Sequence, residues 1–219
     1  MRTDFRQQLE SLQDDLGAMC ALAGDAVGNA TRGLLDVDED AAREVARDIG
    51  RLRFLHSTVE KRTLAILAKQ APVAGDLRRV VTAIHVAADA DRMGGLASHV
   101  AKVGLRRHPR SAVPHELHGR FIEMGSTAVG LAECCRDILT TGDCAQAARV
   151  RSDDRVMETM HRELFGQVMS PGWEHGAVVA SDVVLLGRFY GRFADHADEI
   201  ARRMVFQTSG EALAREQAI

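Results

Sequence analysis

Gly187–Ala201 reads GRFYGRFADHADEIA, and Ala87–Ala101, one hundred residues earlier in the chain, reads AADADRMGGLASHVA. At this offset several positions carry the same or a similar residue. The matched pairs are Arg92 with Arg192, Met93 with Phe193, Ala97 with Ala197 and Ala101 with Ala201. At a slightly larger offset, the matches are Val45 with Val150, Asp48 with Asp153 and His56 with His161. Matches at separate places with similar offsets indicate an internal repeat.

Apolar residues recur at intervals of three and four through both halves, which is the period of one face of an α-helix. Six such runs predict helices over residues 5–34, 45–66, 77–103, 117–138, 150–168 and 178–204. No stretch of the sequence has the alternating pattern of a convincing β-strand. The sequence therefore predicts an all-α fold of two tandem antiparallel three-helix bundles with their apolar stripes facing inward, and it leaves open that the bundles are continuous end to end.

Short breaks rich in polar residues, glycine or proline separate the predicted helices. The predicted turns lie at Asp36–Asp40, Gln70–Pro72, Thr141–Asp143 and Pro171–Gly172. The clearest linker is Arg107–Pro114, which holds prolines at 109 and 114. We therefore expect two domains, a first three-helix repeat over residues 1–108 and a second over residues 114–210.

Composition restricts the function. The net charge is −3 and both signs are interspersed, so no basic stripe indicates a nucleic-acid partner. No apolar run approaches the roughly 20 residues of a membrane span, and no apolar segment of a secretory signal follows the N-terminus. The motifs of nucleotide-binding loops and of a serine nucleophile are missing. We therefore expect a cytoplasmic protein that is not an enzyme and has no transmembrane segment.

Carboxylates are the candidates for a functional site. Asp154 and Glu158 are four residues apart, so they project from one face of a helix. Asp195 lies in the next helix, and facing helices can hold a cation between carboxylate oxygens. The alternative is a solvated acidic face. Five histidines are interpreted as structural or surface residues: His56, His85, His99, His161 and His196.

Three segments resemble the PhoU family of phosphate-signalling regulators. Gln70–Arg79, QAPVAGDLRR, resembles the family segment that opens the third helix. Ala88–Gly95, ADADRMGG, and Arg188–Ala197, RFYGRFADHA, resemble its acidic E/DxxxD motif, once in each half. The sequence around Arg92 and Arg192 looks most like that of actinobacterial members. The resemblance covers nearly the whole chain in order.

This resemblance implies a cytosolic homodimer of two-bundle chains. It implies a regulatory adaptor that binds a membrane sensor histidine kinase and the ATPase of the phosphate ABC transporter. Such an adaptor represses the phosphate-starvation (Pho) response and restrains high-affinity phosphate uptake. Family members also bind metal clusters through paired acidic motifs, one pair in each bundle, so the implied cofactors are divalent or ferric ions (Mg, Mn, Fe or Zn), or none.

The chain departs from this metal pattern, more in the first half than in the second. In the first repeat, Asp48 and Asp91 remain, but leucine and glycine stand four residues after them. In the second repeat, Asp154, Glu158 and Asp195 remain, and glycine occupies position 191, four residues before Asp195. We therefore expect any metal site to lie in the second bundle, with water filling the place left by the glycine.

A second hypothesis comes from a different functional class. The same carboxylates in a helical bundle would suit a carboxylate-bridged metal protein, either a metal store or an oxidase-like enzyme. The two hypotheses differ in metal content, because only the second requires tightly bound redox-active ions.

Overall fold

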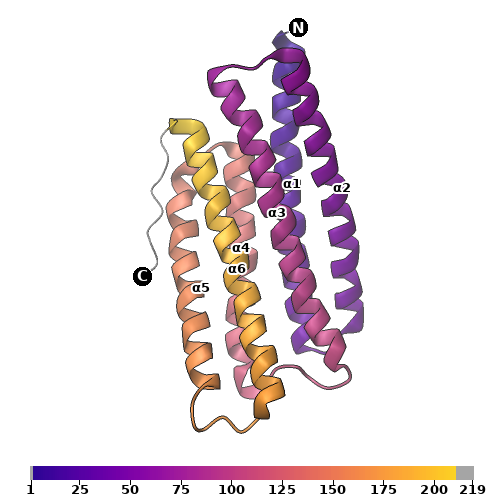
Figure 1. Ribbon diagram of the computed structural model, residues 1–219, viewed down its shortest axis with the longest axis vertical. Helices are drawn as coiled ribbons and strands as arrows, with labels where there is room; N and C mark the ends of the chain where they lie inside the picture. The colour runs from indigo at the N-terminus through magenta and orange to yellow at the C-terminus, as the bar shows by residue number, and fades with distance from the viewer. Residues whose placement is uncertain (1, 211–219) are drawn as a thin grey trace.

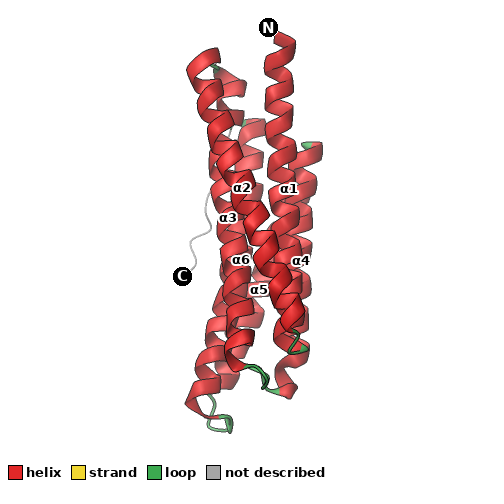
Figure 2. Ribbon diagram, turned by 90° about the vertical axis from the view of Figure 1, so that its right-hand side faces the viewer, coloured by secondary structure: helices red, strands yellow, loops and turns green. Residues whose placement is uncertain are grey.

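Six long α-helices dominate the computed structural model, which describes residues 2–210 and their side chains from Phe5 onward (Figure 1). The helices are α1 (Arg2–Leu35), α2 (Glu39–Gln70), α3 (Ala74–Arg107), α4 (His118–Thr141), α5 (Ala147–Val168) and α6 (Gly176–Ser209). Single 3₁₀ turns, η1 (His115–Leu117) and η2 (Cys144–Gln146), precede α4 and α5. The described part of the chain contains no β-strand, so the all-α prediction is confirmed (Figure 2). None of the described helices is long and apolar enough to cross a membrane.

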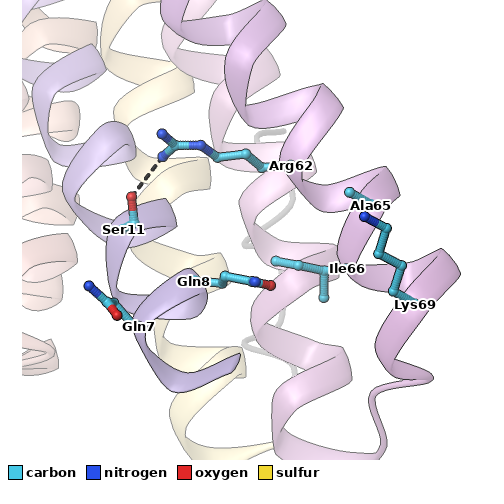
Figure 3. A pocket seen from close by; sticks show the side chains of 7 residues that line it. All are labelled: Gln7, Gln8, Ser11, Arg62, Ala65, Ile66 and Lys69. Atoms are coloured by element: carbon cyan, nitrogen blue, oxygen red, sulfur yellow. Dashed lines mark hydrogen bonds between the residues drawn. The ribbon is translucent and has the colours of Figure 1, made fainter. Parts of the chain in front are cut away.

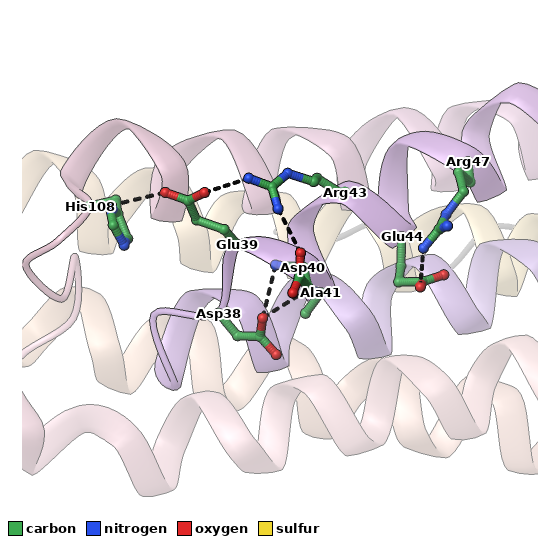
Figure 4. Close-up of polar contacts among 8 residues, drawn as sticks. All are labelled: Asp38, Glu39, Asp40, Ala41, Arg43, Glu44, Arg47 and His108. Carbon is green, nitrogen blue, oxygen red and sulfur yellow. Dashed lines mark hydrogen bonds and ion pairs between the residues drawn. The ribbon is translucent and has the colours of Figure 1, made fainter.

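The start of α2 follows from its N-cap residue. Asp38 has extended backbone angles, and its Oδ1 accepts hydrogen bonds from the backbone N–H groups of Asp40 (2.9 Å) and Ala41 (3.1 Å) (Figure 4). These bonds satisfy donors that have no partner inside the helix. Glu39, the first helical residue, also contacts Nδ1 of His108 at 3.2 Å, which ties the start of α2 to the inter-repeat linker. The break between helices predicted at residues 36–40 is confirmed, and it supplies the N-cap of α2.

The end of α4 is set by a glycine. Gly142 has φ +72°, in the left-handed region that only glycine adopts without strain, and its N–H bonds to the carbonyl of Ile138 at 2.9 Å. This is the turn predicted at residues 141–143.

Each half of the chain forms an antiparallel three-helix bundle, as predicted. Helices α1, α2 and α3 contact one another, and so do α4, α5 and α6. The two bundles lie side by side along their long axes, with α1 against α4 and α3 against α6 (Figures 1 and 2). The end-to-end continuation that the sequence left open is therefore wrong. Side-by-side packing joins the apolar residues of both bundles into one hydrophobic core.

Small residues allow α1 and α4 to approach closely. A Cβ added at Gly24 would lie 3.1 Å from the Cβ of Ala132, and one added at Gly125 would lie 2.6 Å from the methyl of Thr31. The hydroxyl of Thr31 also hydrogen-bonds that of the buried Tyr190 on α6, at 2.7 Å. The seam between the repeats is therefore packed as tightly as a core.

Part of the predicted inward stripe on two helices is exposed. The apolar runs that begin at residues 77 and 178 were predicted to face the core. Five of their members lie exposed instead: Leu77, Val81 and Ile84 of α3 with Val178 and Leu185 of α6. α3 and α6 pack against each other and against their own bundles, so one side of each helix is left facing outward.

Candidate functional site on the second bundle

Helices α5 and α6 bring together the carboxylates predicted for the second repeat. Burial raises the pKa of Asp154 to about 6, and the negative charges of Asp195, Asp198 and Glu158 add to this effect. Asp154 on α5 therefore lies within electrostatic range of two acids on α6. We call these four residues the acidic face.

The members of the acidic face differ in their own partners. Glu158 is exposed and pairs with Arg162 at 2.9 Å, one turn further along α5. Asp198 lies 4.0 Å from both Arg151 and Arg202. Burial raises the pKa of Asp198, although the two arginines oppose the shift. Asp154 is half-buried and has no such pair among the described residues, so a bound cation would relieve its repulsion by the neighbouring carboxylates.

Histidine 161 lies beside the acidic face, one turn beyond Glu158. A Cβ added at Gly187 would lie 2.9 Å from Cδ2 of His161, and one added at Gly191 would lie 3.9 Å from its Nδ1. Burial and the charge of Arg188 lower the pKa of His161, so the neutral form is favoured. The imidazole thus covers the two glycines and lies next to the position where the predicted fourth acid is missing.

The sequence analysis missed this histidine as a candidate ligand. Glu158 and His161 have the Glu-x-x-His spacing that places a carboxylate and an imidazole on one helix face in carboxylate-bridged metal proteins. The sequence-based interpretation that no Glu-x-x-His pair is present is therefore wrong, because residues 158 and 161 have this spacing.

The donor chemistry of the acidic face suits a hard cation, since carboxylate oxygens are the preferred ligands of Mg²⁺ and Mn²⁺. The side chains as placed do not converge. Among the described residues, no group of three His, Cys, Asp or Glu side chains is positioned to hold a metal ion. A cation bound here would therefore have to draw Glu158 and Asp195, both exposed, inward towards Asp154.

The first repeat arranges its candidate acids differently. Asp48 is buried on α2, and its Oδ2 accepts a hydrogen bond from Nδ2 of Asn29 on α1 at 3.3 Å. Burial raises the pKa of Asp48 above its usual value, and the acids that contribute to the rise, Asp25 and Glu44, lie on α1 and α2. Asp91 lies on α3 and is half-buried, and among the described residues no hydrogen bond or ion pair joins it to Asp48. The pairing of Asp48 with Asp91 stays a prediction.

The buried acid of α3 is Asp89, two residues before the one that the motif indicated. Its Oδ1 accepts hydrogen bonds from Nδ1 of His196 (3.1 Å) and Nη1 of Arg92 (3.2 Å), and its Oδ2 lies 3.5 Å from Nε of Arg203. Burial raises the pKa of Asp89, but the bond from His196 and the surrounding positive charges outweigh burial, so the pKa lies below its ordinary value. Asp89 is a structural link between α3 and α6.

A second link joins the same two helices at the C-terminal end of α3. Asp182 of α6 is 2% exposed, and it accepts hydrogen bonds from Nη2 of Arg106 (2.7 Å) and Nε of Arg107 (2.5 Å) in the last turn of α3. Charge-assisted bonds of this kind are stronger than neutral ones. The two repeats are thus linked at the middle of α3, by Asp89, and at its C-terminal end, by Arg106 and Arg107.

Comparison with known proteins agrees with this architecture. The sequence model of the PhoU domain matches residues 16–103 and 121–204, one copy in each bundle. Both segments fall inside the predicted domains 1–108 and 114–210, whose exact limits stay a prediction. The crystal structure of PhoU from Pseudomonas aeruginosa superposes with a TM-score of 0.82 at 23% identity, covering 94% of this chain and all of that one. The structure of the phosphate transport system regulatory protein PhoU from Streptococcus pneumoniae gives a TM-score of 0.84 at 19% identity, covering 96% of this chain and all of that one. These likenesses establish the fold.

Sequence relatives are closer. The phosphate-specific transport system accessory protein PhoU homolog 2 of Mycobacterium tuberculosis is 48% identical over 210 residues, covering 96% of this chain and 99% of the relative. The PhoU homolog 1 of Mycobacterium leprae is 46% identical, covering 96% of this chain and 95% of the relative. With identity of this degree along nearly the whole of both chains, and a copy of the domain in each bundle, the chain belongs to the PhoU family.

Proposed function

We propose that this chain is a regulatory adaptor of phosphate uptake, which works in the cytoplasm by binding partners and not by catalysis. The observation that carries the proposal is the 48% identity, over 99% of the relative's length, to a protein named as an accessory of the phosphate-specific transport system. Its proposed partners are a membrane sensor histidine kinase and the ATPase of the phosphate ABC transporter. Its proposed output is repression of the phosphate-starvation response and restraint of uptake when phosphate is plentiful.

A groove on the outer side of the first bundle supports a binding role. It has a volume of about 630 Å³ and lies between α1 and α2. Its lining combines apolar side chains with two arginines: Leu22, Arg47, Gly50, Arg51, Phe54 and Leu55. Phe54 is 72% exposed, which is unusual for so large an apolar side chain and marks a contact surface. Arg47 and Arg51 suit a partner segment that carries carboxylates beside apolar residues.

The deciding experiment combines a reporter with capture of partners. In a strain lacking the gene, phosphate-starvation promoters should stay active in rich phosphate, and the wild-type gene should silence them. The tagged protein should capture the transporter ATPase and the sensor kinase from phosphate-replete cells. Normal repression in the deletion strain, with no second copy of the gene to compensate, would contradict the proposal.

The groove that contains Phe54 is tested in the same strain with matched variants. Phe54→Ser should reduce capture of at least one partner and relieve repression. Met169→Ser is the control, because Met169 is similarly exposed but lies at the end of α5, away from the groove. If both variants repress like wild type, the groove is not the partner surface, although the adaptor function would stand.

A homodimer is proposed on separate grounds. Leu77, Val81 and Ile84 form an exposed apolar row on α3, and a second copy of the chain would remove such a row from water. Sedimentation at micromolar concentration should give a dimer, and Ile84→Ser should shift it towards monomer. A monomeric wild type would refute this.

Metal binding is proposed for the second bundle, through Asp154, Glu158 and Asp195. The raised pKa of Asp154 supports it, because a group that holds a proton so firmly gains from a cation. The Glu158–His161 spacing also keeps a metal store or an oxidase-like enzyme as the second candidate function. Metal analysis of protein purified without chelator separates the two, since two redox-active ions per chain with oxygen reactivity would favour the second.

A further inference from the structure

A second pocket lies at the other end of α2, against the first turns of α1 (Figure 3). It has a volume of about 490 Å³. Its lining residues are Gln7, Gln8 and Ser11 of α1 with Arg62, Ala65, Ile66 and Lys69 of α2. We call it the Arg62 pocket. It is far along the sequence from the acidic face and belongs to the first bundle, so it is not part of the site described above.

The lining of the Arg62 pocket is rich in hydrogen-bond donors and carries no carboxylate. Five of its seven residues have N–H or O–H groups, and two of these, Arg62 and Lys69, are cations. The chain as a whole has more acids than bases, 31 Asp and Glu against 28 Lys and Arg. A cavity that gathers cations, amides and a hydroxyl without an acid on its wall therefore has the chemistry of an anion site.

The side chain of Arg62 is held in place from one side only. Its Nη1 donates to Oγ of Ser11 at 2.7 Å (Figure 3), and it also pairs with Asp15 of α1, which is not one of the lining residues. Nε and Nη2 make no bond within the described residues. The guanidinium is thus preorganised and keeps N–H groups for an incoming oxyanion. Because the Ser11 hydroxyl accepts from Arg62, its own hydrogen is available as a further donor.

Lys69 supplies the second charge. It lies seven residues after Arg62, two turns along the same face of α2, and it has no ion-pair partner among the described residues. The buried Ile66 lies between them in the sequence and adds an apolar side chain to the lining. A few polar or charged groups beside apolar side chains are typical of a small-molecule site.

We propose that the Arg62 pocket binds a soluble phosphate compound, with its phosphate oxygens between Arg62 and Lys69 and with Gln7, Gln8 and Ser11 as additional donors. The volume exceeds the needs of a lone phosphate ion, so the pocket suits a pyrophosphate or a phosphorylated metabolite better than inorganic phosphate. The inference is independent of the proposed adaptor role, because it concerns a small-molecule ligand and not a protein partner.

The test is calorimetric titration of the full chain with inorganic phosphate, pyrophosphate and ATP at matched ionic strength. We expect saturable binding, tighter for pyrophosphate or ATP than for phosphate. Lys69→Gln should weaken it about tenfold, since a hydrogen bond to a charged group contributes about 1.5 kcal/mol. Lys61→Gln is the matched control, because it removes the same charge from an exposed position of α2 outside the pocket.

Each outcome of the titration either supports or overturns the proposal. Binding that is weakened by Lys69→Gln and kept by Lys61→Gln supports the proposal, and tighter binding of inorganic phosphate would identify the free ion as the ligand. An equal loss of affinity in both variants would mean that the probes respond to general charge attraction, and it would overturn the proposed site. No saturable binding of any of the three probes also overturns it. Neither negative result affects the reporter and capture experiments on the adaptor function.

Discussion

His196 of α6 donates from Nδ1 to Oδ1 of Asp89 on α3 across the contact between the two repeats, at 3.1 Å. Both side chains are largely buried. Nε of Arg203 lies 3.5 Å from the other carboxylate oxygen and has no hydrogen-bond partner of its own. The carboxylate of Asp89 therefore shares the charge compensation of Arg203 with Glu199, whose Oε1 lies 2.7 Å from Nη2 of the same guanidinium.

Asp89→Asn should destabilise the fold, because a neutral amide cannot form the ion pairs with Arg92 and Arg203 and leaves Glu199 as the acid beside Arg203. We expect a loss of about 2 kcal/mol in the free energy of unfolding at pH 7, measured by urea denaturation. Asp91→Asn, two residues further along α3 and only half-buried, is the control and should change it by less than about 0.5 kcal/mol. Equal effects of the two substitutions would mean that the α3–α6 link is not specific to Asp89.

The ionisation of Asp89 should also contribute to acid denaturation. The folded-state pKa of Asp89 lies below its ordinary value, so its contribution is present above about pH 4, the unfolded pKa, and is lost as pH falls through the folded pKa. The stability difference between wild type and Asp89→Asn should therefore shrink below pH 4.

Asp154 should show the opposite pH dependence. Its folded-state pKa of about 6 is above the unfolded value, so folding favours the protonated acid. This stabilising contribution is present below about pH 4 and is lost as pH rises through 6. In the presence of chelator, Asp154→Asn should match wild type near pH 4. It should be more stable at pH 7.5 by about 1 kcal/mol, a figure reduced for solvent screening of a half-buried group.

The control for Asp154 is Asp153→Asn. Its carboxylate lies 3.7 Å from Arg149 on the same helix and does not belong to the acidic face. We expect no comparable gain at pH 7.5. A pH-independent difference between Asp154→Asn and wild type would show that charge crowding on α5 and α6 is not its cause.

Gly187→Ala tests the close approach of α5 to α6. The added methyl would lie 2.9 Å from both Cδ2 of His161 and Cδ2 of Leu164, so side chains must move. We expect a loss of about 1–3 kcal/mol in thermal or urea unfolding. Gly166→Ala on α5 is the control, because nothing lies within 4 Å of its added methyl. There alanine should stabilise the helix by about 0.5–1 kcal/mol.

The fold was predictable because its determinants are local and repeated. The helical period, the breaks between helices and the helix caps each depend on residues that are close together in the sequence. The N-cap at Asp38 and the turn at Gly142 are examples. The side-by-side packing was not predictable, since it depends on pairs such as Gly24 with Ala132 or Thr31 with Tyr190, which are more than a hundred residues apart. For the same reason, the outward side of α3 could not be told from its core side by apolar content.

The candidate site was predicted in part. The spacing of Asp154 and Glu158 placed both on one helix face, and the repeat placed Asp195 on the neighbouring helix. Asp89 was missed because the motif pointed to Asp91, and two helical positions rotate a side chain about 200° around the helix axis. Which acid of α3 is buried depends on the neighbouring α6, whose His196 and Arg203 hold Asp89.

The last prediction concerns the missing fourth acid of the second repeat. Gly191→Glu should strengthen binding of Mn²⁺ or Mg²⁺ about tenfold, because it adds a hard oxygen donor and a negative charge beside Asp195. The backbone has room for the change, since an added Cβ would meet only Nδ1 of His161, at 3.9 Å. Asp195→Asn should weaken binding by a similar factor. Both are measured by calorimetry on protein freed of metal by chelation.

Gly166→Glu is the matched control for charge, because it adds the same carboxylate to an exposed position of α5 outside the acidic face. It should leave the affinity within about twofold of wild type, since an exposed charge acts on a distant cation only through screened attraction. If Gly166→Glu strengthens binding as much as Gly191→Glu, the cation responds to net charge and not to a site. If wild type, Gly191→Glu and Asp195→Asn bind equally, the assignment to Asp154, Glu158 and Asp195 is wrong. A gain confined to Gly191→Glu, together with a loss in Asp195→Asn, would show that α5 and α6 still hold the arrangement of a cation site from which one carboxylate is missing.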